Sequence, residues 1–328
     1  MNILCATDDK FAQHCAAMLI SVLKNNPANI SIYILTESLS NYNEAKLKLT
    51  VTENGGNIHI VTVNPEILKD CPMPSDPQLS HISKATYYRL WLSKLLPNSV
   101  EKIIYLDCDI VVRHSLIDLW ETPLNNLALG AVYHIGSSNI NEIKRLGYPV
   151  KYGYFNAGVL LINLRYWRDN NIPEKLIEFL FIHKDTIHFH DQDVLNGVLF
   201  DKCIMLPCKW NMLNAFFLKS TLRINDINEE IIINDYSEYK KQILINKDDP
   251  VVIHFASTPK PWNIGCRHPY KNEYYHYLQY TPWYEFKVPK IRYLTLRDFK
   301  SLYPLLRSKI HILISNPYFK IKKRKYTM

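Results

Sequence analysis

Short apolar runs rich in β-branched residues alternate with helix-length segments through most of the first 200 residues, and this alternation constrains the fold more than any other feature. Breakers separate the segments, as at Asn25-Asn26-Pro27 and Asn54-Gly55-Gly56. Strands joined through helices are typical of βαβ units, in which the helix brings the chain back so that the next strand runs parallel to the first. The sequence therefore predicts an α/β domain whose mainly parallel sheet is covered by helices on both faces.

The expected elements follow from the periodicity of apolar residues. The expected strands are 2–7, 30–35, 58–63, 102–106, 127–133, 159–164 and 251–255, and the expected helices are 11–24, 40–52, 83–96, 173–184 and 191–200. Residues 214–249 have no clear period and receive no assignment. Beyond Pro269 the chain becomes crowded with aromatic residues, so we expect a boundary between a body, residues 1–269, and a C-terminal region, residues 270–328.

The net charge of +8 is distributed unevenly along the chain. Residues 287–328 contain 12 Lys and Arg against one acid, Asp298, a net charge of +11, whereas the remaining 27 basic and 30 acidic residues give −3. Apolar residues interleave with the basic ones, a composition that favours peripheral docking on an anionic membrane surface. The alternatives are a nucleic acid or a protein partner for this tail; we expect the membrane and no nucleic acid.

The location of the protein is predicted from what the sequence does not contain. No apolar stretch reaches the roughly 18 to 20 residues that span a bilayer, and residues 1–9 lack the basic start of a signal peptide. The seven scattered cysteines suit reduced thiols. We therefore expect a cytoplasmic protein that associates peripherally with the cytoplasmic face of the inner membrane.

The nine glycines form neither a GxGxxG loop nor a GxxxxGK loop, so a bound diphosphate needs another source of positive charge. A divalent cation is the obvious source. Asp107 and Asp109 directly follow the strand 102–106, and residues i and i+2 of an extended chain face the same side. Two such carboxylates repel each other without a cation between them. The alternative is a pair of solvated acids in a loop.

His254 lies within an apolar strand and is either a hydrogen-bonded core histidine or a third metal ligand. A nitrogen ligand beside two carboxylates favours Mn²⁺, with Mg²⁺ as the alternative ion. Three other polar residues have structural explanations of their own: Asp191 as a helix cap, Asn156 as a turn residue and Lys260 in a rigid surface loop.

Seven ordered blocks over roughly residues 1–265 together resemble a known family. They are residues 3–9, 81–83 with 87–90, 105–109, 154–164, 167–168, 191–197, and 254 with 260–262. The chain is similar to the retaining glycosyltransferases of family eight, of the bacterial lipooligosaccharide α-galactosyltransferase type. That resemblance implies a GT-A fold, Rossmann-like and nucleotide-sugar-binding, for residues 1–269, and a small basic helical membrane-attachment region for residues 270–328.

The resemblance also implies an activity. The enzyme would transfer galactose or glucose from a UDP-sugar to a hydroxyl of a saccharide acceptor, such as a lipooligosaccharide, a lipopolysaccharide or another cell-surface glycan, and form an alpha linkage. Asp107, Asp109 and His254 would bind Mn²⁺. The route with retention is either double displacement, with Gln192 or Asp191 as the nucleophile, or attack by the acceptor on the face that the leaving group departs from.

The remaining donor-site residues come from the same resemblance. Ala6 and Asp8 would contact uridine, Arg89 and Lys260 would hold the diphosphate and the donor-sugar side, and Asn156, Asp191 and Gln192 would surround the sugar. The full implied set is Ala6, Asp8, Lys10, Arg89, Cys108, Asn156, Ala157, Asp191, Gln192, Ser257 and Lys260.

Three departures from the family pattern concern ligand contacts. Lys10 stands where an Asn is common, and Ser257 stands where a Gly is often found beside the diphosphate. His134 lies where the galactosyltransferase has an acid that helps to hold the acceptor, so we expect a different acceptor.

Two competing functions remain. A metal-dependent nucleotidyltransferase also joins an α/β sheet to paired acids, but residues 6–9 are acidic and glycine-free where such an enzyme needs a basic, glycine-rich loop. A non-catalytic membrane-surface binding protein leaves the acidic blocks of the body unexplained.

Overall fold

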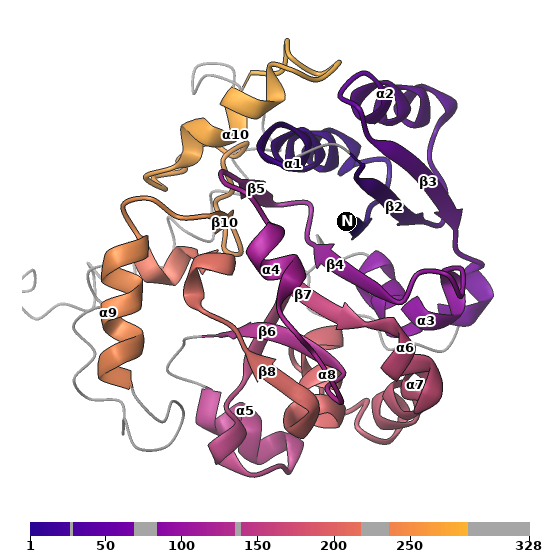
Figure 1. Cartoon of the computed structure of the whole chain (residues 1–328), viewed down its shortest axis with the longest axis vertical. Helices are drawn as coiled ribbons and strands as arrows, with labels where there is room; N and C mark the ends of the chain where they lie inside the picture. Colours follow the sequence, from indigo (N-terminus) through magenta and orange to yellow (C-terminus); the bar gives the residue numbers. More distant parts are fainter. Residues whose placement is uncertain (27–28, 69–83, 135–138, 218–235, 288–328) are drawn as a thin grey trace, which may run out of the picture.

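The computed structural model describes residues 1–26, 29–68, 84–134, 139–217 and 236–287 (Figure 1). Its centre is a seven-stranded sheet of order β3-β2-β1-β4-β7-β6-β8. The strands are β1 Asn2–Ala6, β2 Ser31–Thr36, β3 Asn57–Thr62, β4 Lys102–Leu106, β6 Leu129–Tyr133, β7 Phe155–Asn163 and β8 Cys203–Met205. All neighbouring pairs are parallel except those of β7, which is antiparallel to both β4 and β6. The predicted mainly parallel sheet is confirmed.

A second sheet contains three short strands in the order β5-β10-β9, with β5 at Ile110–Val112, β10 at Val252–His254 and β9 at Met212–Leu213. Strand β5 begins one residue after Asp109. It pairs antiparallel with β10, so that His254 lies opposite Ile110. The Phe255 amide donates a hydrogen bond of 3.0 Å to the Asp109 carbonyl. This small sheet therefore delivers His254 to the segment that carries the two acids.

Helices cover both faces of the large sheet. The α-helices are α1 Ala12–Asn25, α2 Asn41–Thr52, α3 Leu92–Leu95, α4 Ile117–Glu121, α5 Asn139–Leu146, α6 Leu164–Asp169, α7 Ile172–Ile182, α8 His190–Leu199, α9 Tyr236–Asn246 and α10 Lys271–Leu278. The 3₁₀ turns are η1 Pro65–Leu68, η3 Lys84–Trp91, η4 Val150–Tyr152, η5 Phe200–Lys202, η6 Cys208–Trp210 and η7 Asn214–Phe217.

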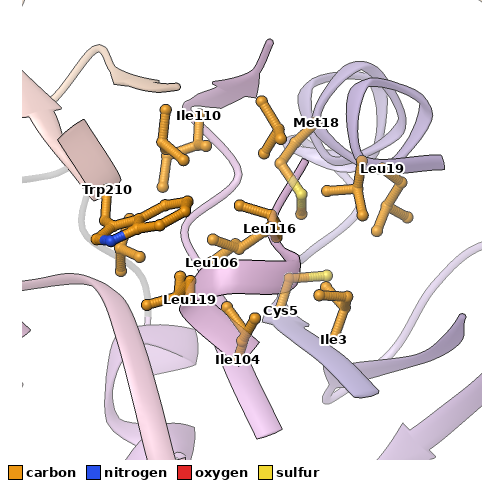
Figure 2. Packing of buried hydrophobic residues seen from close by; sticks show 14 of the residues in the cluster. Ile3, Cys5, Met18, Leu19, Ile104, Leu106, Ile110, Leu116, Leu119 and Trp210 are labelled. Carbon is orange, nitrogen blue, oxygen red and sulfur yellow. The ribbon is translucent and has the colours of Figure 1, made fainter. Parts of the chain in front are cut away.

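Alternate residues of the central strands supply two separate apolar clusters, one on each face of the sheet. Ile3 and Cys5 of β1 belong to the cluster under α1 and α2, whereas Leu4 belongs to the cluster with α3, α6, α7 and α8. Figure 2 shows the first cluster, in which Met18 and Leu19 of α1 meet the side chains of β1 and β4.

The expected bounds agree with the structure to within one or two residues for most elements, with two exceptions. The expected helix 83–96 is a 3₁₀ helix, η3, followed by a single α-helical turn, α3, and its first residue lies outside the described residues. Strand β7 begins at Phe155, four residues earlier than expected, because Asn156 and Gly158 interrupt the apolar pattern that marks the rest of the strand.

The aromatic segment after Pro269 packs against the body. Helix α10 lies along α1, where the Tyr274 hydroxyl is 2.8 Å from His14 Nδ1 and accepts a 2.9 Å hydrogen bond from Gln13. The predicted boundary at residue 270 stays a prediction, since residues 288–328 lie outside the described part of the chain. Within the described ranges, every helix is too short or too polar to cross a bilayer.

Candidate active site

A pocket of about 450 Å³ lies at the carboxyl ends of β1 and β4. In the sheet, β2 and β3 follow on one side of β1, whereas β4 lies on its other side, so the strand order reverses between β1 and β4. Such a reversal is where ligands bind in open α/β sheets. Every residue of the expected metal and donor sites lines this pocket, with one exception. Lys10 is exposed and absent from the lining; its amide instead donates a 2.9 Å hydrogen bond to Asp8 Oδ1.

The antiparallel direction of β7 brings the Asn156-Ala157-Gly158 segment to the two acids. Since β7 starts where β4 ends, Gly158 lies beside Asp107, and the Asp107 amide donates a 2.9 Å hydrogen bond to the Gly158 carbonyl. A Cβ at residue 158 would lie 2.2 Å from His254 Cε1 and 2.9 Å from Asp107 Oδ2. Glycine is therefore required at this position for close packing against the cluster.

Asp107, Asp109 and His254 form the cluster that the sequence predicted. One ligand atom from each lies within 4.8 Å of the other two. His254 Nε2 is 3.2 Å from Asp109 Oδ1 and 3.8 Å from Asp107 Oδ2. His254 is buried, whereas Asp107 keeps 28% of its side chain exposed toward the pocket. Two carboxylates and one imidazole nitrogen thus converge at the wall of a solvent-connected cavity.

The hydrogen bonds around this cluster fit a bound cation. The buried Asn211 Oδ1 lies 2.9 Å from His254 Nδ1 and accepts the proton of that nitrogen, so that the lone pair of Nε2 faces the two acids. The buried Asp109 Oδ1 has no hydrogen-bond partner among the described residues. Three electron-pair donors directed at one point repel one another unless a cation lies between them, and this set of donors suits a divalent metal.

Lys260 contacts the cluster from the opposite side. Its Nζ lies 2.5 Å from Asp109 Oδ2 and also donates to the Phe255 carbonyl. Burial by itself would raise the pKa of the Asp109 carboxyl, but the positive charge of Lys260, together with the neighbouring His254, outweighs it and holds that pKa well below its usual range. Asp109 is therefore ionised and ready to bind a cation at any physiological pH.

The 3₁₀ geometry of η3 explains how Arg89 reaches the site. Residues three apart lie on the same side of a 3₁₀ helix, so Thr86 and Arg89 both contact Asp191, at 3.0 Å to Oδ1 and 3.0 Å to Oδ2. Arg89 also binds Asp107 Oδ1 at 2.8 Å and donates to the Ala157 carbonyl at 2.6 Å. One buried guanidinium thus joins the metal side of the pocket to the sugar side.

Asp191 is not a simple helix cap. It lies in the first turn of α8, whose N-cap is Phe189, and it is buried against Arg89 and Thr86. Burial raises the pKa of Asp191 to about 6; Arg89 opposes this shift and the charge of Asp107 adds to it.

We expect Arg89→Met to lower the free energy of unfolding by about 3–5 kcal/mol, because it leaves two acids without their buried partner. The matched control is Lys94→Met, which breaks the exposed Lys94–Glu174 pair and should cost less than about 1 kcal/mol. Urea unfolding followed by circular dichroism measures both. Equal losses in the two variants would show that Arg89 is not a structural support of the site.

Gln192 is held by hydrogen bonds at both ends of its amide. Its Oε1 accepts bonds of 3.0 Å from Asn156 Nδ2 and 3.0 Å from the Ala157 amide, and its Nε2 donates a bond of 3.1 Å to the Tyr154 hydroxyl. Tyr154 in turn donates a 2.7 Å bond to the fully buried Asp193. Gln192 therefore presents a fixed orientation to the pocket.

A second series of bonds connects Gln192 to His254. The Asn156 side chain, which donates to Gln192, accepts a 2.8 Å bond from Asn211 Nδ2 through its own Oδ1. Asn211 then accepts from His254. The sugar side and the metal side of the pocket are thus joined through two asparagines, each of which uses both its donor and its acceptor.

Sequence reasoning missed Asn211, because it lies outside every recognised block and its neighbours form no motif. The pocket also contains Thr86 and Phe189, which no pattern singled out, and Tyr105, which belongs to the block 105–109 but was given no role. His134, noted as a departure from the family, lines the pocket as well; burial lowers its pKa to about 4. The block 81–83 lies outside the described residues.

Comparison with known proteins places this site in a family. The sequence profile of glycosyl transferase family 8 matches residues 2–265. General stress protein A of Bacillus subtilis is 30% identical over 296 residues, which cover 89% of this chain and 97% of that protein. The lipopolysaccharide 1,2-glucosyltransferase of Escherichia coli K12 is 24% identical, over 97% of this chain and 87% of the relative.

A solved structure resembles the fold as well. The galactosyltransferase LgtC, in complex with donor and acceptor sugar analogs, superposes with a TM-score of 0.73 at 28% identity, over 88% of this chain and 98% of LgtC. The chain belongs to glycosyl transferase family 8. The resemblance drawn from the sequence and the GT-A fold that it implied are both confirmed.

Proposed function

We propose that this glycosyltransferase moves galactose or glucose from a UDP-sugar to a hydroxyl of a lipopolysaccharide-type glycan, with retention and an alpha linkage. The observation that carries the proposal is the Asp107–Asp109–His254 cluster at the wall of the pocket between β1 and β4. Two similar proteins support it: the Escherichia coli relative is a lipopolysaccharide 1,2-glucosyltransferase, and LgtC is a galactosyltransferase whose structure was solved with donor and acceptor sugar analogs.

We infer that the cluster holds Mn²⁺, because two carboxylates and a histidine nitrogen are a mixed ligand set; Mg²⁺, which prefers oxygen ligands, is the alternative. When bound, the ion supplies Lewis-acid stabilisation of the diphosphate leaving group. Lys260 lies beside Asp109 on the pocket wall, where its ammonium is placed to bind phosphate oxygens. On the sugar side, Asp191 and Gln192 are placed to accept and donate hydrogen bonds to hydroxyl groups.

Same-face attack is the route that the hydrogen bonds favour. Both oxygens of Asp191 are engaged, by Thr86 and by Arg89, and Gln192 Oε1 already accepts two bonds. A nucleophile in a double displacement would have to break such a contact before attacking the anomeric carbon. These residues instead suit positioning of the sugar while the acceptor hydroxyl attacks.

Hydrolysis of UDP-sugars without acceptor tests the donor. In the presence of Mn²⁺ we expect slow release of UDP from UDP-galactose or UDP-glucose and no release of nucleotide from GDP- or CDP-sugars. We also expect UDP plus Mn²⁺ to raise the melting temperature of the protein. Nucleotide release and differential scanning fluorimetry give the two readouts. If UDP plus Mn²⁺ leaves the melting temperature unchanged and no UDP-sugar is hydrolysed, the proposal is wrong.

We further propose that residues 287–328 attach the protein to the cytoplasmic face of the inner membrane. The net charge of +11 supports this, since each basic residue near an anionic leaflet contributes about 1 kcal/mol. Tyr280 and Tyr284 are exposed just before the tail, and aromatic residues of this kind suit a membrane interface.

Deleting residues 287–328 should abolish sedimentation with vesicles containing anionic lipid while leaving UDP-sugar hydrolysis in solution unchanged. Zwitterionic vesicles are the control and should bind neither form. Undiminished binding of the truncated protein to anionic vesicles would refute the anchor.

A further inference from the structure

We propose that Cys5, Cys15 and Cys108 form a binding site for one thiophilic divalent ion, such as Zn²⁺ or Cd²⁺, separate from the carboxylate cluster. The three sulfur atoms lie within 4.8 Å of one another, and Cys5 Sγ is 3.5 Å from Cys15 Sγ. All three residues are buried free thiols. Among the described residues they are the second group with the spacing of metal ligands.

The fold brings the three cysteines together from distant positions in the sequence. Cys5 lies on β1, Cys108 directly follows β4, and these strands are neighbours in the sheet. Cys15 lies in the first turn of α1, which covers the same face. Figure 2 shows Cys5 beside Ile3 and below Leu19 of that helix. The sulfur cluster thus lies where β1, the first turn of α1 and the turn between β4 and β5 meet.

The spacing of the sulfurs matches a shared ion. Zinc–sulfur bonds are about 2.3 Å long, so three thiolates around one ion lie about 3.8–4.0 Å apart. Cys5 Sγ and Cys15 Sγ are 3.5 Å apart, and all three sulfurs lie within 4.8 Å of one another. The three sulfurs are therefore already close to the separation that one shared ion requires.

The surroundings select for a soft ion. The neighbouring side chains are apolar, and the oxygen in contact is the Ala6 carbonyl, 3.3 Å from Cys108 Sγ. Mn²⁺ and Mg²⁺ prefer oxygen ligands, whereas thiolates favour Zn²⁺ and its heavier congeners. The chain thus offers a hard-ion site and a soft-ion site, which share the segment 107–109.

The ion can reach the three sulfur atoms from the donor pocket, and its binding balances in atoms and charge. Cys108 lines the donor pocket with 7% of its surface exposed, whereas Cys5 and Cys15 are fully buried, so the ion enters from the pocket past Cys108. Three S–H bonds break, three metal–sulfur bonds form, and three protons leave to solvent. No electrons are transferred, and the site keeps a net charge of −1.

Occupation of the sulfur site would affect catalysis through Cys108, a consequence that rests on the proposed function. Cys108 lies between Asp107 and Asp109 in the sequence. A bond from its sulfur to an ion under α1 would therefore fix the position of the segment 107–109 and so change the orientation of both carboxylates. Turnover falls, and added Mn²⁺ does not restore it because the two ions do not compete for the same ligands.

The test is an anaerobic titration of the full-length, reduced, metal-free protein with Cd²⁺ in excess Mn²⁺. The readout is the ultraviolet charge-transfer absorption of cadmium–thiolate bonds, to which carboxylates and imidazole do not contribute. We expect each chain to bind one equivalent of Cd²⁺ tightly, and we expect Cys5→Ala and Cys15→Ala to lose this binding. If one of these two variants fails to fold, the other is sufficient for the test. Cys208→Ala, which removes an equally buried thiol outside the cluster, should keep it.

The proposal is overturned if no band saturates at one equivalent, if both cluster variants keep it, or if Cys208→Ala removes it. Turnover of the UDP-sugar is the second readout. Cd²⁺ in excess Mn²⁺ should slow the wild type roughly tenfold, the effect expected when the orientation of a metal ligand is disturbed. The same addition should leave the turnover of Cys5→Ala unchanged. A protein that shows the band but hydrolyses no UDP-sugar would keep this inference and lose the proposed function, so the two failures are distinguishable.

Discussion

Asp109→Asn should reduce Mn²⁺-dependent UDP-sugar turnover by at least about 10²-fold, the effect of removing one electrostatic group at a transition state. Asp109 supplies an ionised oxygen, Oδ1, that receives no hydrogen bond from the residues that the structure describes and lies 3.2 Å from His254 Nε2. Asparagine has the same shape but no charge, so the cation loses one of its two carboxylates. Lys260 keeps an oxygen to which it can donate, so we expect the fold to survive the substitution.

The experiment for Asp109→Asn needs both a binding and a stability readout. Mn²⁺ affinity, from the electron paramagnetic resonance signal of free Mn²⁺, should weaken together with turnover, whereas the far-ultraviolet circular dichroism spectrum should match the wild type. Asp249→Asn is the matched control, since it makes the same change at a surface carboxylate that is 67% exposed. Wild-type turnover in Asp109→Asn, or full activity of the wild type in excess chelator, would exclude a metal-dependent mechanism at this cluster.

The local pattern identifies Asp107, Asp109 and His254 as candidates because each interrupts or follows a strongly apolar strand, but it leaves His254 either a core histidine or a ligand. Such strands have clear bounds, and chemistry placed at their ends can be located from local pattern alone. The resemblance to family 8 is what joined the three into one predicted metal site. It also supplied the order of the remaining blocks. Besides Asp107 and Asp109, eleven of the implied residues line the pocket, and Lys10 is the one that does not.

What the sequence could not predict depends on long-range pairing. Asn211 reaches His254 only because β9 and β10 are neighbours in a three-stranded sheet, and β9, a strand of two residues, leaves no periodic signal. The antiparallel direction of β7, which brings Gly158 to Asp107, is likewise a property of the sheet and not of the local sequence. The helix expected at 83–96 is a 3₁₀ helix over most of its length, a geometry that places Arg89 against two acids distant in the sequence and that the local apolar period does not indicate.

Asn211→Leu should weaken Mn²⁺ binding by about 10- to 100-fold, the range found when the partner that orients a metal-ligating histidine is removed. Leucine keeps the branched arrangement of side-chain heavy atoms, but it removes the acceptor of the His254 Nδ1 proton and the donor to Asn156 Oδ1, which keeps its 3.0 Å bond from the Gly158 amide. The imidazole is then free to rotate or to change tautomer, so that its Nε2 no longer faces the acids at all times. Because all three ligands remain, saturating Mn²⁺ should restore much of the turnover, unlike in Asp109→Asn.

Asn211→Asp separates the two contacts of this side chain. A carboxylate still accepts from His254 but cannot donate to Asn156, so we expect Mn²⁺ affinity near that of the wild type and a raised KM for the UDP-sugar. Asn196→Leu is the control for general damage: Asn196 is equally buried and holds both the amide and the carbonyl of Phe155, but it does not contact His254. It should lower the melting temperature while changing Mn²⁺ affinity less than about twofold. If Asn196→Leu weakens Mn²⁺ binding as much as Asn211→Leu does, the effect is loss of packing, and Asn211 has no specific role in orienting the metal ligand.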